Sequence, residues 1–152
     1  MSEELSVSTS ENRAPWIVWG AGAIGGTIGA AFIEAGEKVI FVDNVVAHVE
    51  AINRNGLRIT GPMGDQCVRA LAYLPVEMAQ SFRGRLSAVL LAVKSHHTPA
   101  AMRDITPLLA PQGYVASLQN GLNESTIADG PRLRRLRSCR AGWQQGYGLC
   151  RR

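Results

Sequence analysis

The order of apolar and polar positions predicts a chain in which short strands alternate with helices. Trp16–Trp19 is wholly apolar and ends at a glycine cluster, which is typical of a strand buried on both faces. Small and apolar residues then continue at helical length from Ile24 to Ala35, and Gly36 is well placed to end that helix. Lys38–Asp43 predicts a second buried strand. Together these segments have the length of one strand–helix–strand unit.

The next segments predict a helix and a hairpin. The helix is expected to run from Val45 to Asn55 and to end at Gly56. We expect its buried face to consist of Val45, Val49 and Ile52. Leu57–Thr60 and Cys67–Leu71 flank a turn that is rich in glycine and proline, and this pattern is typical of two antiparallel strands.

The alternation continues toward the C-terminus. Ser87–Val93 predicts a third strongly buried strand, and a helix is expected from about Thr98 to Leu109, shortened by Pro107. Tyr114–Leu118 predicts another strand, and a further helix is expected to start near Glu124. Strands and helices that alternate at these lengths indicate an α/β fold with a doubly wound, mostly parallel sheet.

The positive charge of the chain is confined to one end. The formal net charge is +4, but residues 129–152 hold seven Arg and a single acidic residue, Asp129. Residues 1–128 therefore carry nine basic and eleven acidic side chains and are slightly acidic. Basicity thus gives no reason to expect nucleic acid as a partner of the folded part of the chain.

The sequence disfavours a disulfide framework, a metal site and a membrane span. Cys67, Cys139 and Cys150 are scattered and odd in number, which favours a reducing, cytoplasmic compartment. Residues 14–33 carry no charge, but they are rich in glycine, and the leader before them has the wrong charge for a signal peptide. We expect residues 1–14 to be disordered.

A glycine-rich loop follows the first predicted strand. Its sequence is Gly20-Ala21-Gly22-Ala23-Ile24-Gly25, which has the G-x-G-x-x-G spacing of a dinucleotide-binding loop. The first glycine permits a tight turn, the second lets a pyrophosphate approach the backbone, and the third lets the helix pack on the sheet. The alternative is a glycine-rich helix that only packs against a neighbour. The strand–loop–helix–strand context favours a Rossmann-type dinucleotide-binding domain over residues 15–128, with all six loop residues as cofactor contacts.

Asp43 ends the second predicted strand, 23 residues beyond Gly20. An acidic residue at this place typically accepts hydrogen bonds from the adenine ribose 2′-hydroxyl and favours NAD. A 2′-phosphate would require a nearby Arg or Lys, and none follows Asp43 before Arg54. The alternative role of Asp43 is to cap the following helix, and both roles are compatible.

Beyond the loop, the segments Leu90-Leu91-Ala92-Val93-Lys94 and Leu118-Gln119-Asn120-Gly121-Leu122 place Lys94 and Asn120 just past two further strands. With the glycine loop, and with Gly56-Leu57-Arg58-Ile59, they make residues 15–128 resemble the N-terminal domain of the ketopantoate reductases (2-dehydropantoate 2-reductases). That family reduces ketopantoate to pantoate with NADPH, in pantothenate biosynthesis.

The resemblance implies roles for individual residues. Lys94 and Asn120 would contact both the nicotinamide side of the cofactor and the 2-keto acid substrate, since an ammonium neutralises a carboxylate or phosphate and an amide orients a hydroxyl or carboxamide. The alternatives are a solvated lysine at a strand end and an ordinary Asn-Gly turn. We expect His96 and His97 to be solvated.

Two departures from the family limit these implications. The family has a basic residue where this chain has Asp43-Asn44, so both NADP(H) and NAD(H) stay open as cofactors. The family's helical C-terminal domain, which supplies the lysine general acid, is absent from the sequence given. We therefore name no catalytic residue and expect weak reductase activity at most.

The Arg-rich tail over residues 129–152 differs in amino-acid composition from the rest of the chain. Our hypothesis is that a frameshift in a GC-rich reading frame produced it. The alternatives to ketopantoate reduction are another 2-keto or 3-hydroxy acid dehydrogenase of the same superfamily, and a non-catalytic nucleotide-binding module whose basic tail recruits nucleic acid.

Overall fold

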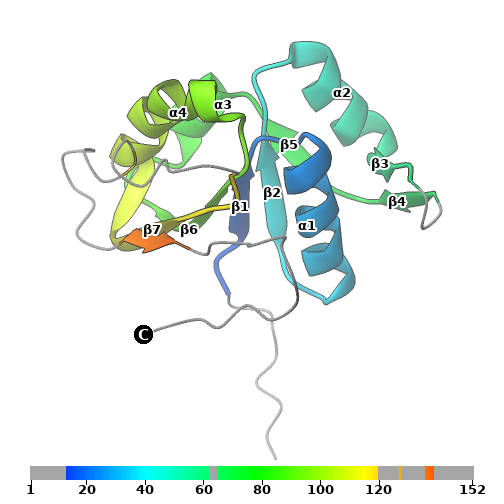
Figure 1. Cartoon of the computed structure of the whole chain (residues 1–152), viewed down its shortest axis with the longest axis horizontal. Helices are drawn as coiled ribbons and strands as arrows, with labels where there is room; N and C mark the ends of the chain where they lie inside the picture. The colour runs from blue at the N-terminus through cyan, green and yellow to red at the C-terminus, as the bar shows by residue number, and fades with distance from the viewer. Residues whose placement is uncertain (1–12, 62–64, 120–126, 128–135, 139–152) are drawn as a thin grey trace, which may run out of the picture.

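The structure is a computed structural model that describes residues 13–61, 65–119, 127 and 136–138. Its main sheet has the spatial order β5-β2-β1-β6-β7-β8 (Figure 1), and every neighbouring pair is parallel. The strands are β1 (Trp16–Trp19), β2 (Val39–Val42), β5 (Leu71–Tyr73), β6 (Leu86–Leu91), β7 (Leu109–Ser117) and β8 (Leu136–Ser138). The order runs outward in both directions from β1, as in a doubly wound Rossmann sheet, so the predicted fold class is confirmed.

Helices cover both faces of this sheet. One face packs against α1 (Ala23–Glu34) and α2 (Val46–Asn55), in a core that contains Val18, Ala30 and Phe41. The other packs against α3 (Pro75–Ser81) and α4 (Thr98–Ile105), in a core that contains Ile17 and Leu91. Figure 1 shows α1 and α4 on opposite sides of the strands. Burial on both faces explains why β1, β2 and β6 are apolar runs rather than alternating ones.

The predicted hairpin is also present. Strand β3 (Leu57–Ile59) pairs antiparallel with β4 (Gln66–Val68) and forms a separate two-stranded sheet beside α2. The sequence predicts that the second strand of the hairpin reaches Leu71, but Leu71 instead begins β5, which pairs in parallel with β2. The extension is wrong because the chain leaves the hairpin after Val68 and joins the edge of the main sheet.

For one residue of the predicted buried face of α2, the prediction is wrong. Val49 and Ile52 are 5% and 2% exposed, as expected, but Val45 is 54% exposed. Val45 is the N-cap residue and has an extended backbone, with φ −92° and ψ 103°. Its side chain therefore does not follow the helical periodicity that buries Val49.

The segment from residue 98 to 117 differs from the prediction in its boundaries. The α-helix ends at Ile105, and a single 3₁₀ turn over Thr106–Leu108 contains Pro107, which fits the expected shortening. Strand β7 begins earlier than predicted, at Leu109, but the register shifts between the pairs made by Leu86 and Ala88. Regular pairing starts at Tyr114, the predicted beginning of the strand.

Four predicted features lie wholly or largely outside the described residues: the leader over residues 1–14, the side chain of Asn120, the helix start near Glu124, and the tail over residues 129–152 apart from Leu136–Ser138. Farther along, Ile127 is helical and fully buried. Within the segment assigned to the tail, Leu136–Ser138 pairs with Val115–Ser117 of β7. The domain boundary at residue 128 and the frameshift hypothesis stay predictions.

Candidate functional site: the loop edge of the parallel sheet

The turn from β1 into α1 requires glycine at its first position. Gly20 has φ +105°, a conformation that side-chain-bearing residues rarely adopt. A Cβ at Gly20 would also lie 2.9 Å from the backbone nitrogen of Val93, which belongs to the turn after β6. The loop is thus packed directly against the turn that carries Lys94.

The second glycine of the loop borders open space, whereas the third is tightly packed. A Cβ at Gly22 would meet no atom within 4 Å, so the backbone there borders open space. A Cβ at Gly25 would clash with the carbonyl oxygen of Gly20 and lie 2.9 Å from the Cβ of Ala92, because α1 packs closely on the sheet. This division matches the separate roles of the glycines in a dinucleotide loop.

The N-terminus of α1 is suited to an anion. Gly22 is the N-cap residue and offers no side-chain cap, and the first turn holds no acidic residue. Ala23 and Ile24 in that turn are exposed. The amides of a first helical turn have no carbonyl partner within the helix, and the helix dipole places partial positive charge on them. A pyrophosphate at Gly22 would satisfy both features.

Asp43 is joined to the loop and to the next helix. Its Oδ2 accepts a hydrogen bond from the Ala21 N–H at 3.1 Å, and its Oδ1 accepts one from the Val45 N–H at 3.0 Å. The bond to Val45 is a turn-type bond to the second residue onward, which shapes the entry into α2. The helix-capping alternative is thus close to what the structure shows, and the bond to Ala21 is an additional role.

His48, which no sequence pattern indicates as a site residue, contacts the same loop residue. Its Nε2 lies 3.0 Å from the carbonyl oxygen of Ala21, and because that oxygen can only accept, Nε2 donates. Ala21, which is 3% exposed, is therefore held at its N–H by Asp43 and at its C=O by His48. The contact spans 27 positions in the chain, and no local pattern indicates it.

Lys94 lies where the sequence predicts, just past β6. It is exposed and borders a hollow of about 250 Å³ between the glycine loop and the turns after β6 and β7. The described residues that line it are Ile24, Ala92, Val93, Lys94, Ser95, His96, Leu118 and Gln119. The hollow thus brings Lys94 and loop residue Ile24 to one place. Asn120, the partner predicted for Lys94, lies outside the described residues.

His96 and His97 are both exposed, as expected for solvated residues, and their rings lie 4.0 Å apart. The described residues contain no group of three or more His, Cys, Asp or Glu side chains that could hold a metal ion. Nor does any helix among them have the length and apolar character needed to cross a membrane.

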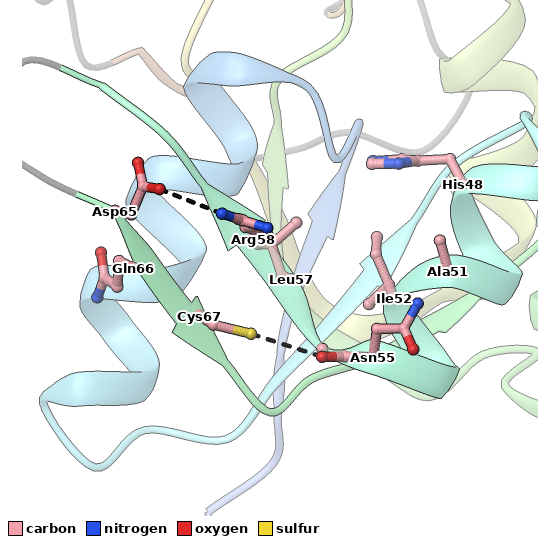
Figure 2. A pocket seen from close by; sticks show the side chains of 10 residues that line it. His48, Ala51, Ile52, Asn55, Leu57, Arg58, Asp65, Gln66 and Cys67 are labelled. Carbon is pink, nitrogen blue, oxygen red and sulfur yellow. Dashed lines mark hydrogen bonds and ion pairs between the residues drawn. The ribbon is translucent and has the colours of Figure 1, made fainter.

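A larger hollow, of about 680 Å³, lies between α2 and the β3–β4 hairpin (Figure 2). Three of its polar side chains are engaged with neighbours: Arg58 pairs with Asp65 at 3.2 Å, and the thiol of Cys67 donates to the carbonyl oxygen of Asn55 at 3.5 Å. His48 also lines this hollow and connects it with the glycine loop through the bond to Ala21. The smaller hollow borders Lys94 at the edge of the sheet where the glycine loop and the turns after β6 and β7 lie, which we call the loop edge.

Comparison with known proteins agrees with this geometry. Residues 16–130 match the family described as ketopantoate reductase PanE/ApbA. The chain belongs to the ketopantoate reductase PanE/ApbA family. The matched range contains the positions of the glycine loop, Asp43, Lys94 and Asn120.

Individual relatives place the resemblance in one part of a longer protein. A 2-dehydropantoate 2-reductase from Mesorhizobium japonicum is 37% identical over 107 residues, which cover 69% of this chain and 31% of that relative. Among solved structures, the PanE/ApbA family ketopantoate reductase from Ralstonia eutropha JMP134 is 33% identical with a TM-score of 0.65, over 76% of this chain and 37% of that one. The 2-dehydropantoate 2-reductase from Geobacter metallireducens is 31% identical with a TM-score of 0.67, over 81% and 40%.

Proposed function

We propose that this chain provides the nicotinamide-dinucleotide site of an enzyme that reduces ketopantoate to pantoate. The observation that carries the proposal is the loop edge of the sheet, where Gly22 borders open space at the start of α1 and Lys94 borders a hollow beside the same loop. Relatives named 2-dehydropantoate 2-reductase support the choice of substrate. The chain spans 31% to 35% of the length of the curated relatives it matches, so the activity of a whole enzyme is part of the proposal.

The adenosine half of the cofactor would lie across the ends of β2 and β5. Val45, Val46 and Val76 follow these two neighbouring strands and are 54%, 53% and 59% exposed. Exposed valines at the carboxyl ends of parallel strands offer apolar surface for a purine ring. Asp43 lies between the end of β2 and Val45 in the chain, and it would accept hydrogen bonds from the ribose hydroxyls.

The nicotinamide half would extend toward Lys94. The cofactor supplies the hydride when bound, and the residues of this chain bind and orient it. The ammonium of Lys94 would neutralise the carboxylate of a 2-keto acid or a cofactor phosphate, and Asn120 would orient a carboxamide or hydroxyl. Reduction of a carbonyl also needs an acid for the developing alkoxide, and we assign none to this chain.

The structure also bears on the choice between NADPH and NADH. Two backbone N–H groups hold the carboxylate of Asp43, so it cannot rotate away from the position that we propose for the ribose 2′-group without losing both bonds. A 2′-phosphate placed there would meet a fixed negative charge. We therefore propose that this chain binds NADH at least as tightly as NADPH, although NADP(H) is the cofactor that the family resemblance implies.

Two assays test these proposals. Calorimetric titration of the chain with NADH and NADPH separately tests the site and the preference. Steady-state oxidation of either cofactor in the presence of ketopantoate tests the activity, which we expect to be weak. Turnover typical of a complete reductase, on the order of 10 s⁻¹, would contradict the expected weak activity.

A further inference from the structure

Gln119 connects three segments of the loop edge. It follows the end of β7, and its side-chain nitrogen Nε2 donates to the carbonyl oxygen of Val93 at 2.6 Å and to the hydroxyl oxygen of Thr98 at 2.7 Å. Val93 belongs to the turn after β6, and Thr98 begins α4. One amide group thus ties the end of one strand to the turn and the helix that follow its neighbour.

The chemistry of these contacts requires an amide at position 119. The carbonyl oxygen of Val93 can only accept, so the atom facing it must be a donor, which fixes the orientation of the amide. The other amide atom, Oε1, accepts from the Ser117 hydroxyl at 3.3 Å. Thr98 is fully buried, and a buried hydroxyl needs a hydrogen-bond partner. A carboxylate or an aliphatic side chain at position 119 could not donate to both oxygens.

The turn after β6, which Gln119 holds through Val93, also contains Lys94. Lys94 directly follows Val93, has an extended backbone with φ −63° and ψ 147°, and its carbonyl oxygen accepts from the His97 N–H at 2.8 Å. The turn is therefore fixed by Gln119 before Lys94 and by His97 after it. The Lys94 side chain is exposed, so the position of its ammonium group depends on the conformation of this backbone turn.

We propose that Gln119 is a positioning residue, which holds the Lys94 turn in the conformation that engages the nicotinamide half of the cofactor. The inference rests on the proposed function. It adds to it a residue whose contribution to binding passes through Lys94 rather than through direct contact with the cofactor. Gln119 also borders the same hollow as Lys94, so the two positions belong to one site.

The test compares two ligands on the full chain. NADH reaches the Lys94 hollow, whereas ADP contains only the half that occupies the glycine loop and Asp43. We expect Gln119→Glu, which keeps the shape and removes the donor, to weaken NADH binding about tenfold, the effect of losing a buried hydrogen-bonded support. ADP binding should stay within about twofold of wild type, because its site does not include the turn. Thr98→Val, which removes one partner only, should give a smaller loss of the same kind.

A double-mutant cycle separates positioning from general weakening of the fold. In a Lys94→Met background, Gln119→Glu should cause no further loss of NADH affinity, since the group it positions is gone. Gln112→Glu makes the same chemical change at an exposed position of β7, the strand that Gln119 follows, and should leave both affinities unchanged.

The outcomes that overturn the inference are distinct from failure of the proposed function. Equal losses of ADP and NADH affinity in Gln119→Glu, or a further loss in the Lys94→Met background, would show a structural role only. An unchanged NADH affinity in both Gln119→Glu and Thr98→Val would remove the role altogether. If wild-type chain bound neither ADP nor NADH, the proposed function itself would be wrong, and this inference with it.

Discussion

The carboxylate of Asp43 is bonded to the backbone of Ala21, 22 positions earlier in the chain, at 3.1 Å between Oδ2 and the amide nitrogen. This bond joins the end of β2 to the glycine loop after β1. It fixes the side chain that would face the ribose relative to the backbone that would face the pyrophosphate. The bond thus connects the two parts of the proposed nucleotide site, and such preorganisation would lower the entropic cost of binding.

The glycines of the loop give the first prediction. Gly22→Ala should leave the free energy of unfolding within about 0.5 kcal/mol of wild type, because its backbone has φ −75° and its Cβ would meet no neighbour. It should weaken NADH binding about tenfold or more, since the methyl group would occupy the space of the pyrophosphate. Denaturant unfolding and calorimetry measure the two effects.

Gly25→Ala serves as the matched control, because the same methyl group would there clash with the carbonyl oxygen of Gly20. It should destabilise the chain by about 1–3 kcal/mol through overpacking. Full NADH affinity in Gly22→Ala would mean that the open space beside this residue is not the phosphate site.

Asp43 gives a prediction on cofactor preference. Asp43→Asn removes the negative charge and should raise NADPH affinity relative to NADH affinity by about tenfold, because one repulsive charge pair is lost. The measured quantity is the ratio of the two dissociation constants, which corrects for any general effect on the loop. An unchanged ratio would place the 2′-group away from Asp43.

The bond from His48 to Ala21 gives a third prediction. His48→Ala leaves the carbonyl of the buried residue Ala21 without this donor and should weaken binding of ADP and NADH equally, by about three- to tenfold. ADP is informative because the loop contacts the half of the cofactor that ADP contains. His48→Gln, which can still donate, should recover part of the loss. If NADH binding weakened while ADP binding did not, His48 would act elsewhere.

The helix α2 offers a test of the packing that supports the site. Val45→Ala and Val49→Ala delete the same atoms, but Val45 is 54% exposed and Val49 is 5% exposed. We expect a loss of about 2 kcal/mol for Val49→Ala and less than about 0.5 kcal/mol for Val45→Ala, from urea unfolding curves. Equal losses would contradict the observed start of the helix.

The parts of the site that can be predicted from the sequence are those defined by the order of neighbouring residues along the chain. The loop at Gly20–Gly25 was predictable because each glycine has a fixed place between a strand and a helix, and Lys94 because it ends a strongly apolar run. His48 and Gln119 were not predicted as contacts, since their partners lie 27 and 26 positions away and no spacing rule relates them. Such contacts exist only after the sheet has formed.

The missed elements of the fold have a similar reason. Strand β5 has three residues and a half-exposed start, with Leu71 57% exposed, so it shows neither alternation nor a buried run. Helix α3 has seven residues and buries only Met78, too little for a helical period to stand out. Helix α3 has a local start signal, with Pro75 in its first turn and a hydrogen bond from the Leu74 N–H to the Glu77 carboxylate, but such a short signal does not by itself define a helix.

The most direct test of the central claim is calorimetric titration of the wild-type chain and of Gly22→Val with NADH, with circular dichroism to show that both are folded. The account predicts saturable one-to-one binding to the wild type and none to Gly22→Val at the same concentrations. Absence of saturable binding to a folded wild-type chain, or equal binding to both chains, would contradict a dinucleotide site at the Gly20–Gly25 loop.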